Sequence, residues 1–570
     1  MAAVPRRSGD DRMWRWAIFS PALLLMLALS VLPLANLLLT SFYDVTWAHG
    51  QAVWTPLGLA NYAALSDDAL FRAGLVNTVI FAVCAVGGQM MLGFLLALLC
   101  CRVTRGQVLY RTVFILPILI PGIVVGAIWK LMLNYDFGLV NQAIGLLGFA
   151  AQDWLGTPQT ALASVILVDI WHWTPFCFLL FLAGLESLGC QDRRRFHLAG
   201  TALRDAAPDA ADHHGDLRLS PDGRLQGIRR GVSADRRRSR HRHRGPELHD
   251  LPALLHREPG GLRCRHVRRG HLPGLGAAGD RIVGPQARGG GGMRMPAAFR
   301  RRGVANHAAL IAASAIVVVP VVWVVAAGFR TQISLLMGAF WFTPILANFN
   351  EVLFSKTSDF LVNYRNSLVV GLTSTALCLV TATLAAWSLH RMRWPGWVVH
   401  VFLGWALVFH MIPPIALAGA WFTMARAVGL DSTLLSLVLA HTVLNLPMAL
   451  WLMGVYVRDV PVELEEAARL DGASTPTLLW RIVVPIIAPG LAAAAVLSFV
   501  FSWNEFAVAL NLTIKATATV PVAIAKFAQD YEIRYTQMAA SAALSILPAL
   551  VLLLIAQRYI VKGLTQGAVK

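Results

Sequence analysis

Charged residues are scarce in this sequence. Asp, Glu, Lys and Arg make up 14% of the 570 residues, while hydrophobic residues make up 56%. Because a soluble domain carries about 25% charged residues, this shortage excludes an ordinary soluble protein. The net charge of +18 would suit a nucleic-acid-binding protein, but much of the basic excess lies in one central segment, residues 190–292.

Sequence patterns for catalysis and metal binding are also missing. The seven cysteines show no CxxC spacing and no metal-ligand pattern, so no metal site is expected. No Ser/His/Asp set stands out, and no GxxxxGK[ST] run occurs. We therefore expect no catalytic residues, no cofactor and no direct binding of ATP.

Long apolar runs dominate the rest of the chain. Each is long enough to cross a hydrocarbon core, which takes about 20 helical residues. A backbone surrounded by lipid must satisfy its own hydrogen bonds, so these runs are expected to be helices. The sequence predicts an all-α, polytopic membrane protein with four spans before residue 190 and six after residue 300, at 16–40, 74–100, 109–133, 159–186, 306–328, 366–389, 397–425, 433–456, 487–511 and 537–560.

The distribution of Lys and Arg between the loops predicts the orientation. If the helices alternate, the basic clusters all fall on one side, whereas loops 41–73 and 426–432 on the other side are nearly free of Lys and Arg. Basic loops stay in the cytoplasm, so we expect a cytoplasmic N-terminus. Both halves then enter the membrane in the same direction, which indicates a parallel repeat.

The central segment 190–292 fits neither half. It is rich in Arg, His and Gly, lacks Lys, Tyr, Trp and Met, and contains no apolar span. It could be a disordered basic linker, an arm that binds RNA or lipid, or the product of a shifted reading frame. Synonymous codons for residues 217–249, read from the second base, permit an apolar run followed by a turn, which favours the frameshift. The first half would then lack its fifth and sixth helices.

One polar run after the span at 433–456 carries the most information. Residues Glu463 to Leu470 suit a short helix, and Gly472 supplies the left-handed position that ends it. Ser474 can cap a second short helix. Ala467 and its neighbour Ala468 offer a small surface that another protein's backbone can approach closely.

These residues resemble the EAA loop of permeases from binding-protein-dependent ABC importers. Glu466, Ala467, Ala468, Gly472, Ile482 and Pro485 fit the family spacing of E-A-A, three residues, G, nine residues, I, two residues, P. Other stretches, among them the break at Ile412, Pro413 and Pro414, look like the maltose-type carbohydrate subclass. The resemblance covers about residues 14–189 and 293–570, and departs where the first half's own EAA loop is expected, just after Leu188.

The resemblance implies two permease units in one chain. The first, residues 1–189, would be incomplete, with four transmembrane helices. The second, residues 293–570, would have six and would carry the EAA loop at 463–487. The residues expected to couple to an ATPase are Glu466, Ala467, Ala468, Asp471, Gly472, Ile482 and Pro485.

The resemblance also implies a function. Such a permease is a multi-pass protein of the bacterial plasma membrane, the inner membrane, and moves a sugar or polyol into the cytoplasm by alternating access. A separate pair of ABC ATPase subunits hydrolyses ATP, and an extracytoplasmic solute-binding protein delivers the substrate. The permease is a transport subunit and not an enzyme, and no nucleic acid is expected to bind.

A polar cluster inside an apolar run suggests the substrate pathway. Trp503, Asn504 and Glu505 interrupt the span at 487–511, and an ionisable residue within a membrane usually faces a cavity or a partner. The alternative is a hydrogen bond that only assembles the helices. Asp169 and His172 raise the same question in the first half, whereas His410 and Asn445 suit packing.

Two other classes of function compete with the importer. An ion-coupled secondary transporter would need no ATPase, but the EAA spacing and the lack of paired intramembrane charges speak against it. A basic membrane protein that binds nucleic acid would depend on residues 190–292 alone.

Overall fold

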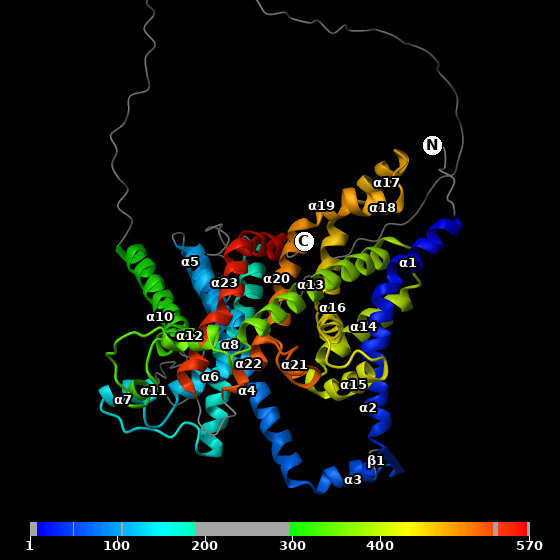
Figure 1. Ribbon diagram of the computed structural model, residues 1–570. Coiled ribbons are helices and arrows are strands. Elements are labelled where there is room, and N and C mark those ends of the chain that lie inside the picture. The colour runs from blue at the N-terminus through cyan, green and yellow to red at the C-terminus, as the bar shows by residue number, and fades with distance from the viewer. Residues whose placement is uncertain (1–7, 49–50, 104–105, 188–296, 528–533, 567–570) are drawn as a thin grey trace, which may run out of the picture. The chain divides into compact units, whose positions relative to one another are not determined.

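In the described part of the chain, long helices alternate with shorter helices and loops (Figure 1). The predicted out-of-frame segment at 190–292 and the expected position of the first EAA loop lie outside the described residues. The computed structural model describes residues 8–48, 51–103, 106–187, 297–527 and 534–566.

The first half begins with three helical segments in direct succession and ends with a long helix. Its elements are α1 (Ser8–Met26), the π-helix η1 (Leu27–Val31), α2 (Leu32–Thr40), β1 (Tyr43–Ala48), β2 (Gln51–Pro56), α3 (Ala60–Asp67), α4 (Ala69–Arg102), α5 (Gln107–Ile115), the 3-10 helix η2 (Leu116–Leu119), α6 (Gly122–Met132), α7 (Leu139–Leu146) and α8 (Pro158–Ser187).

The second half is longer and contains the predicted EAA loop, residues 463–487. Its elements are α10 (Ala297–Gly328), α11 (Gln332–Leu336), α12 (Ala347–Phe354), α13 (Phe360–Arg391), α14 (Gly396–Met411), α15 (Pro414–Ala427), α16 (Leu434–Asp459), α17 (Val462–Leu470), α18 (Thr475–Leu478), the π-helix η3 (Leu479–Val483), α19 (Val484–Ile486), α20 (Ala488–Asn504), α21 (Ala507–Leu512), α22 (Val520–Lys526) and α23 (Tyr535–Gln566).

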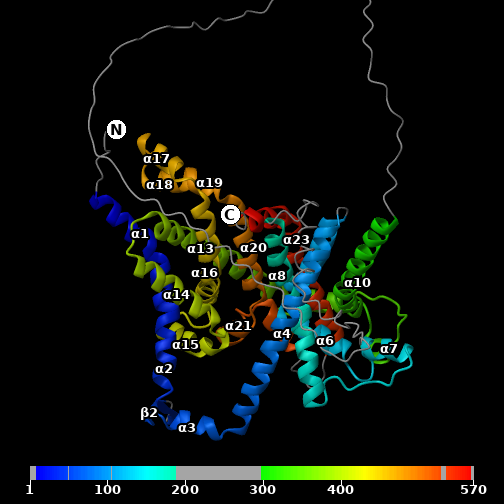
Figure 2. The same ribbon diagram turned by 180° about the vertical axis from the view of Figure 1, so that it is seen from behind.

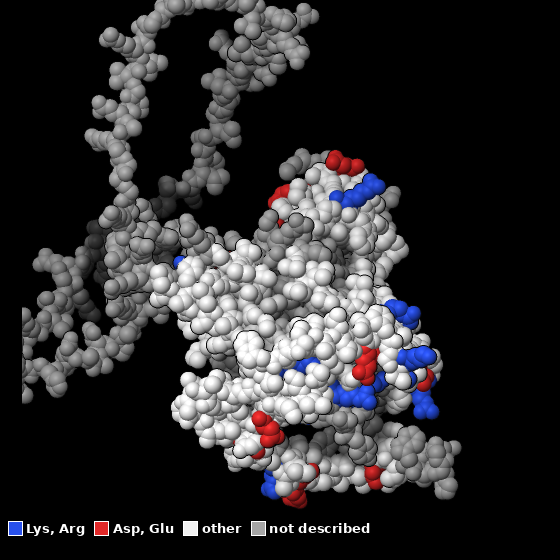
Figure 3. Space-filling model, turned by 60° about the vertical axis from the view of Figure 1, so that its left-hand side comes forward, with Lys and Arg blue, Asp and Glu red and all other residues white. Residues whose placement is uncertain are grey.

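The helices account for the predicted membrane spans. Within the described residues, 7 helices are long and apolar enough to cross a membrane, and the number rises to 10 if each of three bent pairs counts as one span. The prediction of a polytopic α-helical membrane protein is therefore confirmed. Figure 3 shows a broad surface without charged side chains between charged groups at the top and lower on the molecule, as an apolar membrane band requires.

Two predicted spans are not straight. The run at 109–133 bends by 97° between η2 and α6, and the run at 397–425 bends by 104° between α14 and α15. Both bends come at an Ile-Pro pair, where Ile120 and Ile412 have extended backbone angles. Proline lacks an N–H and disfavours a helical residue before it, so the helix stops and a new one begins after Pro121 or Pro413.

The fold also contains a short hairpin that the all-α prediction missed. β1 and β2 pair antiparallel, with Val45 opposite Trp54. Both strands lie between membrane runs and carry β-branched and aromatic residues, which suit a pleated surface. Each strand has six residues. The prediction searched for apolar runs of about 20 residues, so it did not detect strands of this length.

The same order of elements occurs in both halves. A long helix, a bent pair and a second long helix appear as α4, α5 to α6 and α8 in the first half, and as α13, α14 to α15 and α16 in the second. The two long helices pack against each other in each half. This order agrees with the internal repeat that the loop charges predict.

The first helical segment of the chain packs against the second half. Phe19 and Met26 are each 1% exposed and belong to the same core as residues of α13 and α16. Two tryptophans of the second half donate to this segment: Trp405 Nε1 to Ser30 Oγ at 2.7 Å and Trp421 Nε1 to the Leu29 oxygen at 2.8 Å.

Conversely, helix α10 of the second half packs against helices of the first half. Trp171 of α8 donates from Nε1 to the Ile316 oxygen at 3.1 Å, and Tyr110 of α5 shares a 3.0 Å hydrogen bond with Nδ1 of His307. Figure 2 shows α1 beside α14, and α10 on the opposite side of the bundle. Both halves are therefore built into one packed body.

Candidate functional site

The EAA loop forms two short helices at one end of the bundle. Figures 1 and 2 show α17 and α18 beyond the ends of the neighbouring long helices. α17 ends in a Schellman turn, in which Ala473 N donates to the Ala468 oxygen at 2.9 Å and Gly472 N donates to the Arg469 oxygen at 3.1 Å. Gly472 has a φ of 84°, which confirms the predicted left-handed position.

The second short helix begins as predicted. Ser474 is the N-cap of α18, and its hydroxyl accepts a hydrogen bond from Thr477 N at 3.4 Å. Pro476 lies in the first turn, where its missing N–H costs nothing. The local structure of the loop therefore follows from residues that are close in sequence.

The predicted coupling residues divide between an outer and an inner face. Glu466, Ala467, Asp471, Gly472 and Pro485 are exposed, Ile482 is half-buried, and Ala468 is buried. Beside them, Leu470 is 71% exposed and Trp480 is 51% exposed. The outer face therefore combines a carboxylate, a small residue and large apolar side chains.

The buried face of α17 carries an ion pair that sequence reasoning missed. Glu465 is 4% exposed, and its Oε1 lies 2.9 Å from Nε of Arg391 at the end of α13. Glu465 directly precedes the EAA triplet, but its side chain lies on the buried face of α17, where it contacts Arg391. The helical period of α17 places Glu465 and Ala468 on one face. This period was the signal in the sequence that could have identified Glu465 as a buried residue.

A second candidate site is a cavity of about 470 Å³ walled by both halves. We call it the central cavity. Its polar side chains are those of Asp169, His172, Asn504 and Glu505. The structure thus brings together polar residues that the sequence analysis proposed separately in the two halves. The apolar lining consists of Ile118, Gly122, Val125, Gly126, Val165, Val168, Trp173 and Phe501.

Asn504 bridges the halves at this cavity. Its Nδ2 donates to the Ile118 oxygen at 3.0 Å, while its Oδ1 is buried and accepts no hydrogen bond from the described residues. A buried acceptor without a partner is costly. The amide oxygen is therefore an unpaired acceptor within the packing at the cavity wall.

The first-half residues are held by neighbouring backbone and side chains. Asp169 Oδ2 accepts a hydrogen bond of 2.7 Å from Nε2 of Gln89 in α4. His172 Nε2 donates to the Ile120 oxygen at 3.2 Å, next to the bend before α6. Nδ1 of His172 and the second oxygen of Asp169 remain as further polar groups beside the cavity.

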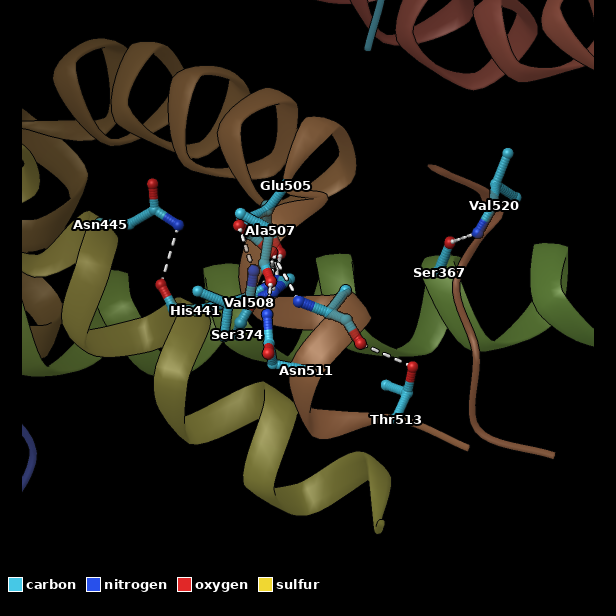
Figure 4. A network of polar contacts seen from close by, with 12 residues as sticks. Ser367, Ser374, His441, Asn445, Glu505, Ala507, Val508, Asn511, Thr513 and Val520 are labelled. Atoms are coloured by element: carbon cyan, nitrogen blue, oxygen red, sulfur yellow. Dashed lines mark hydrogen bonds and ion pairs between the residues drawn. The ribbon is translucent and has the colours of Figure 1, made fainter. Parts of the chain in front are cut away.

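Glu505 both lines the cavity and caps a helix. Its two carboxylate oxygens accept hydrogen bonds from Val508 N at 2.9 Å and Ala509 N at 3.0 Å, in the first turn of α21 (Figure 4). Oε2 also lies 3.4 Å from Nε2 of His441 in α16. Glu505 therefore has the helix-assembly role that the sequence left open, and its position in the cavity wall is compatible with the pathway role, which stays a prediction.

His441 extends this contact into a buried network. Its Nδ1 shares a 2.7 Å hydrogen bond with Ser502 Oγ, which shares another of 2.9 Å with Ser374 Oγ. The network joins α13, α16 and α20. His441 was not among the predicted site residues, although it is a histidine within an otherwise apolar run. Asn445 donates only to the His441 oxygen one turn earlier, in agreement with a packing role.

Two other singled-out residues lie elsewhere. Trp503 is 1% exposed and is absent from the central cavity lining. Its Nε1 donates to the Ser545 oxygen at 3.1 Å, and its ring stacks on Phe499. His410 lines a separate, almost wholly apolar cavity of about 440 Å³ between the halves.

Comparisons with known proteins identify relatives of the chain. Residues 378–566, which include the EAA loop and Asn504, match the family described as "Binding-protein-dependent transport system inner membrane component". The trehalose transport system permease protein SugB of Mycobacterium tuberculosis is 40% identical over 208 residues, which cover 36% of this chain and 75% of that protein. The trehalose/maltose transport system permease protein MalG of Thermococcus litoralis is 32% identical over 255 residues, covering 44% of this chain and 91% of that protein.

A solved structure of a bacterial ABC transporter involved in the import of the acidic polysaccharide alginate matches with a TM-score of 0.41 and 20% identity, covering 46% of this chain and 98% of that chain. The family model, the identity to SugB and the apolar helices agree with one another. The chain is a multi-pass inner-membrane protein, and it belongs to the permease family of binding-protein-dependent ABC importers, whose members are transport subunits and not enzymes.

Proposed function

We propose that this chain, once the reading frame of its first half is restored, moves a sugar or polyol into the cytoplasm through the central cavity, driven by an ATPase that docks on the EAA loop. The observation that carries the proposal is the central cavity itself, which both halves wall and which Asn504, Glu505, Asp169 and His172 line. Membership of the importer family decides against the ion-coupled secondary transporter.

The chemistry of the cavity supports a sugar as substrate. Sugars offer many hydroxyl donors and acceptors and an apolar ring face, which suit amide and carboxylate groups beside aromatic side chains. Asn504, Asp169 and His172 supply the polar groups, and Trp173 and Phe501 supply the aromatic faces. The relatives SugB and MalG carry trehalose or maltose in their names.

The exposed face of the EAA loop supports docking of an ATPase pair. Glu466 and Ala467 point outward, and Leu470 and Trp480 add apolar area. The positive-inside rule places this loop and the N-terminus in the cytoplasm. A solute-binding protein would then deliver substrate at the opposite end, and closure of the ATPase would turn the cavity outward.

The length of the chain supports two permease units. MalG is covered to 91% by only 44% of this chain, so the chain has room for two such units. The repeated order of long helix, bent pair and long helix supports the same arrangement. Counterparts of α17 to α23 in the first unit would fall after Ser187, where we propose that the reading frame has shifted.

Docking can be tested without transport. The full chain, purified in lipid nanodiscs, should bind its ATPase, and Glu466→Lys should weaken binding about tenfold or more by reversing a charge at the docking surface. Glu463→Lys, which changes an exposed glutamate in the first turn of α17, is the matched control and should have a smaller effect. Equal binding by the wild-type chain and Glu466→Lys would remove the docking assignment.

A further inference from the structure

Arg391 joins three helices at the base of the EAA loop. It is the last residue of α13, and its side chain is 12% exposed. Its Nη2 donates to the Val457 oxygen at 2.6 Å and to the Val460 oxygen, at the C-terminal end of α16. Its Nε lies 2.9 Å from Oε1 of Glu465 in α17. One guanidinium thus ties α13, α16 and α17 together.

The ion pair with Glu465 sets which face of α17 points outward. The other two glutamates of the helix, Glu463 and Glu466, are exposed, whereas Glu465 is buried. A buried carboxylate without a partner is strongly unfavourable. The helix therefore keeps Glu465 turned toward Arg391, and this rotation directs Glu466 and Ala467 outward.

Little of α17 is buried against the membrane helices. It has nine residues, and only Glu465 and Ala468 are buried. An isolated helix shorter than about 12–15 residues is marginal in water, and an alanine side chain adds little apolar area. The contact with Arg391 therefore carries much of the attachment of α17 to the membrane helices.

We propose that Arg391 is a positioning residue that fixes the orientation of the ATPase-facing surface of α17. The proposal rests on the docking role of the EAA loop. Arginine suits the position because its planar guanidinium presents several donors in fixed directions, whereas lysine is a single point charge. The guanidinium also lies at the C-terminal end of α16, where a positive charge is favourable.

The internal repeat supplies a matched control. Arg102 ends α4 as Arg391 ends α13, and α4 has the corresponding place in the first half. Arg102 is exposed, so it does not bury a charge between helices. Arg102→Gln therefore removes the same charge from the same kind of helix end without disturbing α17.

Hydrogen exchange of the full chain in lipid nanodiscs, without ATPase, is the first test. Arg391→Gln and Glu465→Gln should each speed amide exchange of residues 465–470 by about tenfold or more, since local opening controls exchange. The double variant should add little to either single change, because both remove one interaction. Arg102→Gln should leave these rates unchanged, and peptides from the middle of α16 should not respond in any variant.

Affinity for the ATPase is the second test. Glu465→Gln, which alters no residue of the exposed docking face, should weaken ATPase binding about tenfold, and Arg391→Lys should fall between wild type and Arg391→Gln. If the Arg391→Gln variant fails to insert into the membrane, the Glu465→Gln variant decides the test. In that variant Arg391 keeps both of its hydrogen bonds to the end of α16. Wild-type exchange of α17 in Glu465→Gln would overturn the proposal. Failure of the wild-type chain to bind any ATPase would instead count against the docking function, and the exchange rates would still report on Arg391.

Discussion

Asn504 of the second half donates a 3.0 Å hydrogen bond from Nδ2 to the main-chain oxygen of Ile118 in the first half, 386 positions earlier in the chain. Ile118 lies in η2, directly before the bend into α6. The side chain at the end of α20 thus touches the broken helix of the other half. This contact places Asn504 at the joint between the halves and at the wall of the central cavity.

Replacing Asn504 with leucine should impair transport. Asn504→Leu removes the bond to Ile118 and a polar side chain from the cavity wall. We therefore expect uptake of the sugar substrate to fall about tenfold or more when the first-half reading frame is restored, while ATPase binding is retained. Losing a hydrogen bond that orients a substrate commonly costs about 1–3 kcal/mol. Asn511→Leu is the control, because Asn511 is exposed and bonds only to Ala507 in its own helix. Equal uptake in both variants would assign Asn504 to packing alone.

Gly472 should tolerate asparagine but not valine. A Cβ atom at Gly472 would meet no atom within 4 Å, so any effect must come from its φ of 84°. A β-branched residue in this region is strained by about 1–3 kcal/mol, whereas asparagine adopts it more readily. We expect Gly472→Val to weaken ATPase binding and Gly472→Asn to preserve most of it, both with normal membrane insertion. A similar loss in the two variants would point to the side-chain volume instead of the backbone.

Glu505 should contribute to stability as well as to transport. Glu505→Leu leaves the N–H groups of Val508 and Ala509 without acceptors, and each unsatisfied buried group costs about 1–3 kcal/mol. We expect a lower melting temperature in detergent. Glu505→Gln keeps one acceptor oxygen and should lose less. Glu463→Leu, at an exposed position of α17, is the control. A melting temperature unchanged by Glu505→Leu would argue that the cap is dispensable.

The DNA of the segment encoding residues 190–292 should reveal a frameshift. Arginine within a membrane span costs about 2.5–3.5 kcal/mol at the centre of a helix, and arginines occur throughout this segment. It therefore cannot supply the two further helices that a six-span first unit would need. Resequencing should reveal a reading frame that encodes two apolar spans in this segment. The chain as written should be deficient in transport. An uninterrupted frame together with protease resistance of 190–292 in membranes would contradict this expectation.

The amino-acid sequence by itself determined the features that depend on neighbouring residues. Apolar runs long enough to cross a bilayer became helices, because a backbone in lipid has no other source of hydrogen bonds. Gly472 and Ser474 end one short helix and begin the next through bonds that reach only a few residues. Such signals can be read locally, and the structure confirms them.

Only the tertiary structure decided which polar side chains meet. His441 and Ser502 are 61 positions apart, and Asn504 and Ile118 are 386 apart, so no local pattern links them. Trp503 lies next to Asn504 in sequence, yet it packs on Phe499 away from the central cavity. Adjacent residues on a helix point about 100° apart, and the packing of α20 against other helices decides which of them faces the cavity. The same physical reason makes Glu465 a buried partner of Arg391 while Glu466 remains exposed.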